Sequence, residues 1–320
     1  MPPDEAEHPF APYVRTLGRG PGRSRALSQE EARDAFGMIL RGETDPHQTG
    51  AFLMLLRYRG EDADGMAGLV EAARAHLARA PEPIGADLDW PSYGAGRTRG
   101  APWFLLSALA LGQAGHRVLM HGSNAHSQGV PVPDALRLLG WRPAESGADA
   151  ARLLRDTGFA YLPLASLSST LDRLLGLRAL LGLRSPVNTV ARLLNPFDAE
   201  ASVDGVFHPP YIDLHLGTAQ RLGRARLLVV KGGGGEAERN PARPIIAHLL
   251  AGASRHELRL PPLATERPEQ ADFLETWREE TAQTPTVIAT IALGLLALGA
   301  SRDVSRADLD AASIWRARKR

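Results

Sequence analysis

The chain has 320 residues, and its 37 Lys and Arg against 36 Asp and Glu give a formal net charge of +1. This balance excludes a histone-like polycation and an acidic tail protein, because both classes need a large net charge. The absence of cysteine excludes disulfides, thiolate catalysis and thiolate-bound zinc. A 44% hydrophobic fraction, at a length near that of two average domains, predicts a folded chain with extensive cores.

The ends of the chain and its longest apolar run indicate the compartment. Residues 1–10 are acidic and Pro-rich without an apolar run, so we predict neither a secretory signal nor a transit peptide. The run Val287–Ala300 is shorter than the ~20 residues that cross a bilayer. We therefore expect a cytoplasmic protein with no membrane contact.

Three helices without an intervening strand are expected near the N-terminus, which predicts a helical domain over residues 1–83. The first begins at a capping-box pattern, Ser28 with Glu31. The second begins at Asp45 followed by Pro46, a residue favoured in the first helical turn. The expected helices run from Ser28 to Gly42, from Asp45 to near Gly60, and from Asp62 to Arg79.

From residue 84 to 320, short apolar runs alternate with helical stretches, which predicts an α/β domain with a largely parallel, covered sheet. Residues 164–195 interrupt the alternation with a Leu- and Arg-rich helical stretch that could complete the helical domain as an insertion. The expected strands are Ala86–Trp90, His116–His121, Phe159–Leu162, Arg226–Val230 and His256–Leu260. The expected helices are Pro102–Ala114, Pro133–Leu139, Ala148–Asp156, Pro210–Leu222 and the tail Pro268–Arg318.

Acidic residues are unevenly distributed along the chain. Residues 90–133, 173–197 and 214–235 together hold eleven basic residues and no acidic one. Basic groups also lie near both ends, where flexible arms would suit a polyanion because each phosphate contact releases counterions. The alternative is a solvated, disordered terminus. The terminal groups are Arg15, Arg19, Arg23 and Arg25, and Arg316, Arg318, Lys319 and Arg320.

Three glycine-rich segments follow expected strands, where backbone N–H groups can hold a phosphate. The carboxyl ends of parallel strands meet at one edge of a sheet, so the segments are expected to converge on one cleft. Each signal is weak alone, and a tight turn is the alternative. The segments are Tyr93–Gly100, His121–His126 and Lys231–Gly235.

The strings Val118-Leu-Met-His-Gly-Ser-Asn124, Leu183-Arg-Ser-Pro-Val-Asn188 and Leu228-Val-Val-Lys-Gly232 resemble the anthranilate phosphoribosyltransferase family, in order and spacing from about residue 25 to 300. The resemblance implies a nucleoside phosphorylase/phosphoribosyltransferase-like fold, with a small helical domain and a larger α/β domain. It also implies a homodimer formed through the helical domain. The positions that match a phosphate or substrate site are Gly94, Gly96, His121, Gly122, Ser123, Asn124 and Glu238, and Arg184 matches the arginine that contacts anthranilate.

The chain departs from the family's pattern at three places. The GTGGD-type loop reads Gly94-Ala-Gly-Arg97, Met120 replaces the lysine of KHGN, and the Asp-Glu pair that holds magnesium falls on Ala237 and Glu238. Because Mg²⁺ is usually bound through one or two carboxylates plus substrate phosphates, these changes weaken the expected pyrophosphate site. With these substitutions the chain resembles the YbiB-like branch of the family, whose members are regarded as nucleic-acid-binding.

The leading hypothesis is therefore a non-sequence-specific DNA- or RNA-binding protein that holds the phosphate backbone in an Arg-lined cleft, with no catalytic residue, metal or cofactor. The alternative is a phosphoribosyltransferase that uses Mg²⁺ and phosphoribosyl pyrophosphate on anthranilate or a similar aromatic acceptor, and a third hypothesis is a sensor of small phosphates. For His121 we prefer a hydrogen-bonded strand-end histidine, because no partner acid lies nearby in the sequence. The expected phosphate contacts are Arg97, Arg99, Arg184, Arg192, Arg224 and Lys231, with Arg15, Arg19, Arg23 and Arg25 as an accessory arm.

Overall fold

The computed structural model describes residues 7–20, 22–77, 85–94, 100–123 and 129–320. The chain divides into two compact units. The helical unit comprises residues 1–77 and 170–194, and the α/β unit comprises residues 78–169 and 195–320. The stretch after residue 170 that interrupted the predicted strand–helix alternation thus packs with the N-terminal helices.

The predicted starts of two N-terminal helices are confirmed by their caps. Ser28 Oγ accepts from the N–H of Glu31 at 3.2 Å, and the Glu31 carboxylate accepts from the N–H of Ser28 at 2.9 Å. Asp45 caps the next helix by accepting from the N–H of His47 at 2.7 Å. The helices of this unit are α1 (Ala11–Gly18), α2 (Gln29–Arg41), α3 (Pro46–Arg59), α4 (Ala63–Ala75), α9 (Ser169–Gly176), α10 (Arg178–Leu181) and α11 (Val187–Arg192).

Two contacts show how the helices of the helical unit pack together. Helices α2 and α4 approach so closely at Gly68 that a Cβ there would lie 2.0 Å from the carbonyl oxygen of Gln29. Helix α1 packs on α3, where the rings of Phe10 and Phe52 lie 5.4 Å apart. Helix α1 was not predicted, because it has a single buried face and glycines and arginines follow it directly. Its helical pattern is therefore hard to recognise in the sequence.

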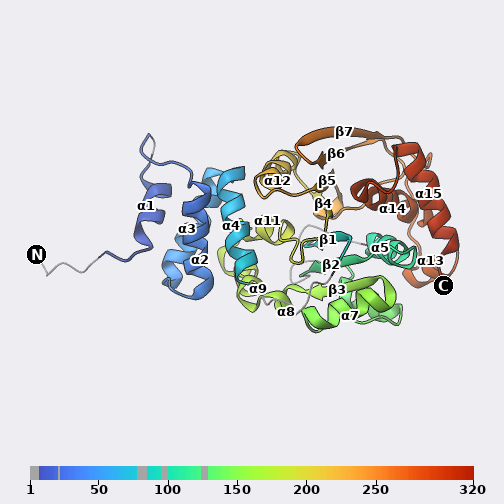
Figure 1. Cartoon of the computed structure of the whole chain (residues 1–320), viewed down its shortest axis with the longest axis horizontal. Helices are drawn as coiled ribbons and strands as arrows, with labels where there is room; N and C mark the ends of the chain where they lie inside the picture. The colour runs from blue at the N-terminus through green and yellow to red at the C-terminus, as the bar shows by residue number, and fades with distance from the viewer. Residues whose placement is uncertain (1–6, 21, 78–84, 95–99, 124–128) are drawn as a thin grey trace, which may run out of the picture. The chain divides into compact units, whose positions relative to one another are not determined.

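The α/β unit is built on a seven-stranded sheet in the order β3-β2-β1-β4-β5-β6-β7, in which β3 to β5 are parallel and β6 and β7 antiparallel (Figure 1). The predicted fold class is confirmed: a small helical N-terminal part and a larger α/β part with a mostly parallel sheet. The strands are β1 (Leu88–Ser92), β2 (Val118–Gly122), β3 (Phe159–Pro163), β4 (Ala201–Val206), β5 (Arg226–Lys231), β6 (Ile245–Ala251) and β7 (Ser254–Leu260).

Two strands were missed in the sequence. Strand β4 contains Asp204 and Gly205, residue types depleted in strands, although all six of its residues are buried. Strand β6 is an apolar run without the alternation that separates a strand from a buried helix. The predicted strand His256–Leu260 exists within β7, but it pairs antiparallel with β6 in a hairpin.

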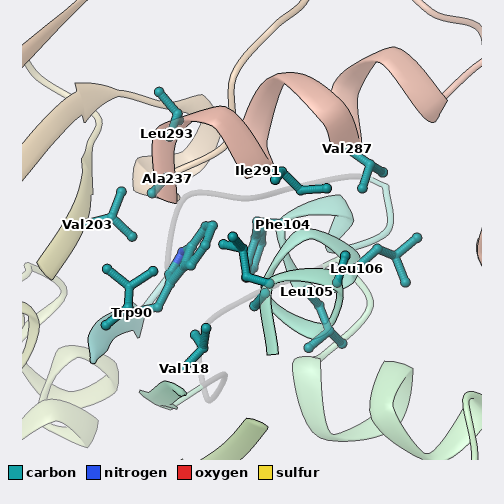
Figure 2. Packing of buried hydrophobic residues seen from close by; sticks show 14 of the residues in the cluster. Trp90, Phe104, Leu105, Leu106, Val118, Val203, Ala237, Val287, Ile291 and Leu293 are labelled. Carbon is teal, nitrogen blue, oxygen red and sulfur yellow. The ribbon is translucent and has the colours of Figure 1, made fainter. Parts of the chain in front are cut away.

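One face of the sheet is covered by apolar helices. Trp90 and Val203 point from β1 and β4 toward Phe104 of α5 and Ile291 of α14 (Figure 2). None of the helices among the described residues is long and apolar enough to cross a membrane. The helices of this unit are α5 (Trp103–Gln113), α6 (Val132–Leu138), α7 (Gly147–Thr157), α8 (Leu164–Leu167), α12 (Pro210–Arg221), α13 (Phe273–Arg278), α14 (Thr284–Leu298) and α15 (Val304–Ala317), with a 3₁₀ turn, η1 (Gly233–Gly235).

The C-terminus is folded rather than a free basic arm, which corrects the expectation for Arg318. Its guanidinium lies 3.5 Å from the ring centroid of Trp315 and donates to the carbonyl oxygen of Trp277 at 2.9 Å. Only 6% of the residue is exposed, and this burial lowers the pKa of Arg318 to about 10. The buried arginine thus anchors the last residues of the chain to α13 and α15.

Candidate functional site

The carboxyl ends of four parallel strands meet at one edge of the sheet. Ser92 at the end of β1 is opposite Gly122 at the end of β2, and Val206 of β4 is opposite Lys231 of β5. The three predicted glycine-rich segments follow β1, β2 and β5. They therefore begin at the same edge, as expected from the sequence. We call this edge, with residues 92–94, 121–123 and 231–239, the carboxyl edge.

Residues 232–239 cross the carboxyl edge because two glycines make room for them. A Cβ at Gly232 would lie 1.6 Å from the carbonyl oxygen of Glu236, and a Cβ at Gly205 would lie 2.1 Å from its carbonyl carbon. Beyond them, the fully buried Arg239 pairs with Asp308 at 2.7 Å. The same residue's N–H donates to Thr290 Oγ1 at 3.0 Å. Both ends of the segment are therefore fixed.

Glu236 was not singled out in the sequence, yet it contacts the start of the first glycine-rich loop. The Ser92 hydroxyl donates to its Oε1 at 3.2 Å. A Cβ at Gly94 would lie 2.2 Å from the same oxygen, so a side chain there would displace the Glu236 carboxylate from this position. Glu236 is 3% exposed. The one signal for it in the sequence was an acid that ends an acid-free interval, directly after four glycines.

The side chain of Glu238 reaches the first turn of α5, where the N-cap residue of the helix makes no side-chain hydrogen bond. Its Oε2 accepts from the N–H of Phe104 at 3.1 Å, across 134 residues of sequence. A carboxylate is favoured there because the unpaired N–H groups of a helix N-terminus carry partial positive charge. The sequence predicts a phosphate site at the glycine loop and the start of this helix. A phosphate that approaches the N–H group of Phe104 there also meets the Glu238 carboxylate.

An acid lies close to His121, which corrects the expectation that none is nearby. Its Nε2 lies 3.2 Å from Asp89 Oδ1, and its Nδ1 is hydrogen-bonded to the Tyr93 hydroxyl at 2.7 Å. Asp89 was not visible as a partner because it lies 32 residues earlier and only the pairing of β1 with β2 brings it close. The ring is fully buried. His121 therefore joins β2 to the loop after β1. This is the hydrogen-bonded strand-end histidine that was expected from the sequence.

The remaining residues of the predicted substrate site divide into two groups. Gly122 is buried, and a Cβ there would lie 2.1 Å from the carbonyl oxygen of Ser92, so β1 and β2 require glycine at this point. Ser123 follows at the carboxyl edge and is half-buried. Gly96 and Asn124 of this site lie outside the described residues, as do Arg97 and Arg99, which were predicted to contact a nucleic-acid backbone.

The predicted phosphate-binding residues are divided between the two units, and within the α/β unit between two edges of the sheet. Lys231 is exposed at the carboxyl edge, but Arg224 precedes β5 and lies at the opposite, amino edge, which corrects its expected place in the cleft. Arg184 and Arg192 belong to the helical unit, and Arg192 is only 8% exposed, so its guanidinium is a poor candidate for a phosphate contact.

The predicted N-terminal arm is largely structured. Arg15 lies inside α1 and pairs with Glu7 at 2.6 Å. Arg25 pairs with the capping residue Glu31, also at 2.6 Å, and this guanidinium lowers the pKa of Glu31 to about 2. The two exposed arginines between them, Arg19 and Arg23, have no ion-pair partner among the described residues.

The carboxyl edge can contribute oxygen ligands but does not enclose a metal by itself. In the part of the chain that the structure describes, no group of three or more His, Asp or Glu could hold a metal ion. Mg²⁺ commonly uses one or two carboxylates and takes its other ligands from substrate phosphates and water. Glu236 and Glu238 fit the role of such carboxylates for an Mg²⁺ that arrives on a substrate.

Two models of glycosyl transferase family domains match this chain. Residues 11–77 match the helical bundle domain of a glycosyl transferase family, and residues 104–271 match the α/β domain of a glycosyl transferase family. Among curated relatives, the uncharacterized protein YbiB of Escherichia coli is 30% identical over 73% of this chain and 74% of its own length. An anthranilate phosphoribosyltransferase of Beijerinckia indica is 30% identical over 80% of this chain and 73% of its own.

Solved structures share the fold over nearly the whole chain. Anthranilate phosphoribosyltransferase from Thermus thermophilus covers 97% of this chain and 94% of its own, with a TM-score of 0.75 and 21% identity. The enzyme from Saccharomyces cerevisiae in complex with PRPP and Mg gives the same TM-score and coverage at 17% identity.

Proposed function

The chain belongs to the anthranilate phosphoribosyltransferase-like superfamily, and from this premise we propose that it transfers a phosphoribosyl group to anthranilate or a similar aromatic acceptor. The observation that carries the proposal is the meeting of Gly94, Glu236 and Glu238 at the carboxyl edge. Ligands of α/β folds bind outside the carboxyl ends of parallel strands. The named relatives and the PRPP- and Mg-bound neighbour support the same chemistry.

The residues of the carboxyl edge have different roles in such a transfer. Phosphoribosyl pyrophosphate is strongly anionic, and when bound with Mg²⁺ the ion supplies charge neutralisation of its pyrophosphate. Glu236 and Glu238 hold negative charge that attracts such a metal–pyrophosphate complex, whereas Lys231 attracts the phosphates directly. The bare backbone at Gly94 lets the substrate come close to the loop.

Turnover tests the proposal directly. The protein is incubated with phosphoribosyl pyrophosphate, Mg²⁺ and anthranilate, and both pyrophosphate release and loss of anthranilate fluorescence are followed. We expect release that requires all three components. A panel of other aromatic acids and nucleobases then identifies the preferred acceptor. Absence of pyrophosphate release with every acceptor contradicts the proposal.

A second candidate function, nucleic-acid binding, is favoured by exposed cations that form no ion pair among the described residues, among them Arg19, Arg23 and Lys231. Such side chains can meet phosphates without first losing a carboxylate partner. We further propose that two copies associate through the helical unit, because a dimer doubles these sites and raises avidity for a long strand.

A salt titration of labelled DNA and RNA tests this candidate. Neutralising six to ten phosphates lowers affinity by about 10³–10⁵ between 50 and 200 mM salt. Arg19→Ala with Arg23→Ala should reduce the salt slope, whereas the matched pair Arg15→Ala with Arg25→Ala removes arginines that already face Glu7 and Glu31. An affinity that does not change with salt excludes binding through the phosphate backbone.

A further inference from the structure

A cavity of about 650 Å³ lies at the opposite edge of the sheet from the glycine loops. Arg117 and Gly158, which line it, directly precede β2 and β3. The other walls come from α5, from Trp141, from the end of α7 and from Lys319 near the C-terminus. Its volume lies within the ~300–1,000 Å³ typical of small-molecule sites. We call it the amino-edge groove.

The amino-edge groove carries uncompensated positive charge. Arg155 and Lys319 are exposed, and neither side chain has a hydrogen bond or ion pair among the described residues. The other charges on the groove are already paired: Arg117 with Asp87 at 2.6 Å, and Asp156 with Arg152 at 3.6 Å. The two remaining cations therefore favour an anionic ligand.

Lys319 is placed in the groove by specific contacts rather than by a loose tail. Its N–H donates to Gln113 Oε1 at 2.7 Å, and its carbonyl oxygen accepts from Gln113 Nε2 at 3.2 Å. The preceding Arg318 is buried against Trp315. Because the backbone is already ordered, a ligand that contacts Lys319 does not have to order the chain end.

Trp141 gives the groove a flat apolar surface. The indole is only partly buried and packs against Phe159 in a T-shaped contact, with ring centroids 6.0 Å apart and an interplanar angle of 85°. Leu154 adds a second apolar contact on the same lining. An aromatic ring next to two cations matches a ligand that has a planar ring and a phosphate.

We propose that the amino-edge groove binds a nucleotide unit, with its base against Trp141 and its phosphate at Arg155 and Lys319. The unit comes either as a free nucleotide or as part of a single strand, since both present the same base and phosphate. This site is separate from the carboxyl edge and does not depend on transferase activity there.

Calorimetric titration of the whole protein with adenosine monophosphate, and anisotropy with a labelled eight-nucleotide single strand, test the site. The variant Arg155→Ala/Lys319→Ala should weaken the bound ligand at least tenfold. The control Arg137→Ala/Arg316→Ala removes the same charge from exposed residues outside the groove and should stay within twofold. Binding of adenosine monophosphate identifies a free-nucleotide site, and binding of the oligonucleotide alone identifies a strand site.

A second variant tests the role of the aromatic ring. Trp141→Leu should remove the preference for adenosine monophosphate over ribose 5-phosphate while the two cations still hold the phosphate. If that variant does not fold, the double alanine variant still decides. The proposal is overturned if the unmodified protein binds neither ligand at 1 mM, or if the double alanine variant binds as tightly as the parent. Transferase turnover of the double variant should be unchanged, which separates this test from that of the proposed function.

Discussion

Glu238 combines two roles that a single substitution can separate. Its carboxylate caps α5 by accepting from the N–H of Phe104, and in the proposed function its charge also attracts a metal–pyrophosphate complex. A glutamine keeps an acceptor oxygen of the same reach but removes the charge. We expect Glu238→Gln to lower kcat/KM for phosphoribosyl pyrophosphate at least tenfold, which is about 1.4 kcal/mol, with little change in Tm.

Two further variants control this prediction. Glu238→Ala removes the cap as well and should cost about 1 kcal/mol of stability in addition. Glu257→Gln removes one carboxylate from an exposed position on β7, away from the carboxyl edge, and should leave turnover unchanged. Steady-state kinetics with thermal unfolding of each variant distinguish the effects. Full activity of Glu238→Gln would show that the carboxylate acts only as a cap.

At the residue scale, the sequence predicted which segments meet but not which side chains touch. The starts of the glycine loops were placed correctly because glycine and the strand pattern are local signals. The Asp89–His121 contact and the pairing of Arg239 with Asp308 arise from strand and helix neighbours far apart in the chain. No local pattern records such contacts. Arg224 was misplaced for the opposite reason, since it was assigned by charge without regard to the end of β5 at which it lies.

At the element scale, two glycines in neighbouring helices should respond to alanine in opposite ways. A Cβ at Gly68 would lie 2.0 Å from Gln29 O and 2.8 Å from Arg33 N, both backbone atoms, so α2 and α4 must separate. Gly50 lies within α3 with open space around it. We expect Gly68→Ala to destabilise by about 1–3 kcal/mol and Gly50→Ala to stabilise by about 0.5–1 kcal/mol.

Chemical denaturation followed by the far-UV signal measures both variants. The pair is matched in chemistry, so a shared change in unfolded-state entropy cancels between them. Equal stabilities of the two variants would mean that α2 and α4 are not in close contact in solution.

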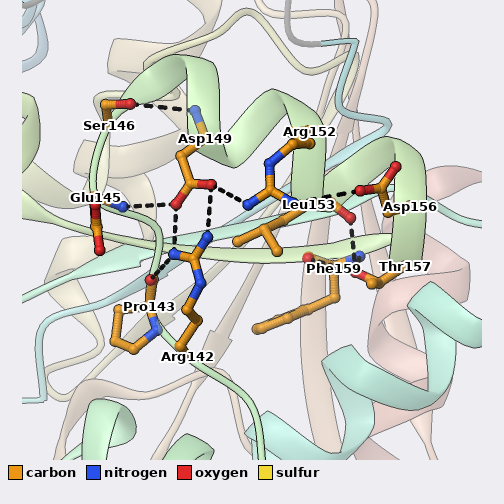
Figure 3. A network of polar contacts seen from close by, with 10 residues as sticks. All are labelled: Arg142, Pro143, Glu145, Ser146, Asp149, Arg152, Leu153, Asp156, Thr157 and Phe159. Carbon is orange, nitrogen blue, oxygen red and sulfur yellow. Dashed lines mark hydrogen bonds and ion pairs between the residues drawn. The ribbon is translucent and has the colours of Figure 1, made fainter.

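The start of α7 illustrates an element stabilised by charge. Asp149 accepts from Arg142 Nη1 at 2.6 Å and Arg152 Nη2 at 2.7 Å, while its own N–H donates to Ser146 Oγ at 3.2 Å (Figure 3). The hydrogen bonds from Arg142 hold the pKa of Asp149 well below its usual range. Because both arginines are about half exposed, we limit the contribution of the pairs to about 1 kcal/mol.

The pH dependence of this contribution follows from the direction of the shift. A carboxyl whose pKa is lower in the folded state stabilises the protein fully above its unfolded pKa of ~3.9, and the gain is lost as the pH falls toward the folded value. Asp149→Asn should therefore lower the free energy of unfolding by about 1 kcal/mol at pH 7 and by less at pH 3. Urea titrations at both pH values measure it, and an equal loss at both would mean that charge is not the cause.

Helices were predicted more reliably than strands for a physical reason. Capping residues such as Ser28 and Asp45 act on their own backbone, so their pattern is local. Strand β4 depends instead on burial between β1 and β5, which overrides the low strand propensity of Asp204 and Gly205. Likewise, the direction of β7 is set by the hairpin with β6 rather than by its own residues.

At the scale of the whole molecule, the near-zero net charge hides how the charges are used. Many arginines already form an ion pair or are buried, as Arg25 and Arg318 show, and are therefore poor candidates for binding a polyanion. Among the described residues, exposed cations without an ion pair include Arg19 and Arg23 in the helical unit, Lys231 at the carboxyl edge, and Arg155 and Lys319 in the amino-edge groove.

The two candidate sites of the α/β unit lie at opposite ends of the same strands, and this separation predicts that they act independently. Strands β2 and β3 have five residues each, which at ~3.3 Å per residue sets the edges about 16 Å apart. The Debye length is ~8 Å at physiological salt, so the charges of two bound anions are largely screened from each other.

We expect the Kd for adenosine monophosphate to change less than twofold when phosphoribosyl pyrophosphate and Mg²⁺ are saturating. By thermodynamic reciprocity, the nucleotide should alter the affinity for phosphoribosyl pyrophosphate equally little. Calorimetric titrations in both orders measure the coupling, and mutual exclusion would mean that both ligands occupy a single edge of the sheet.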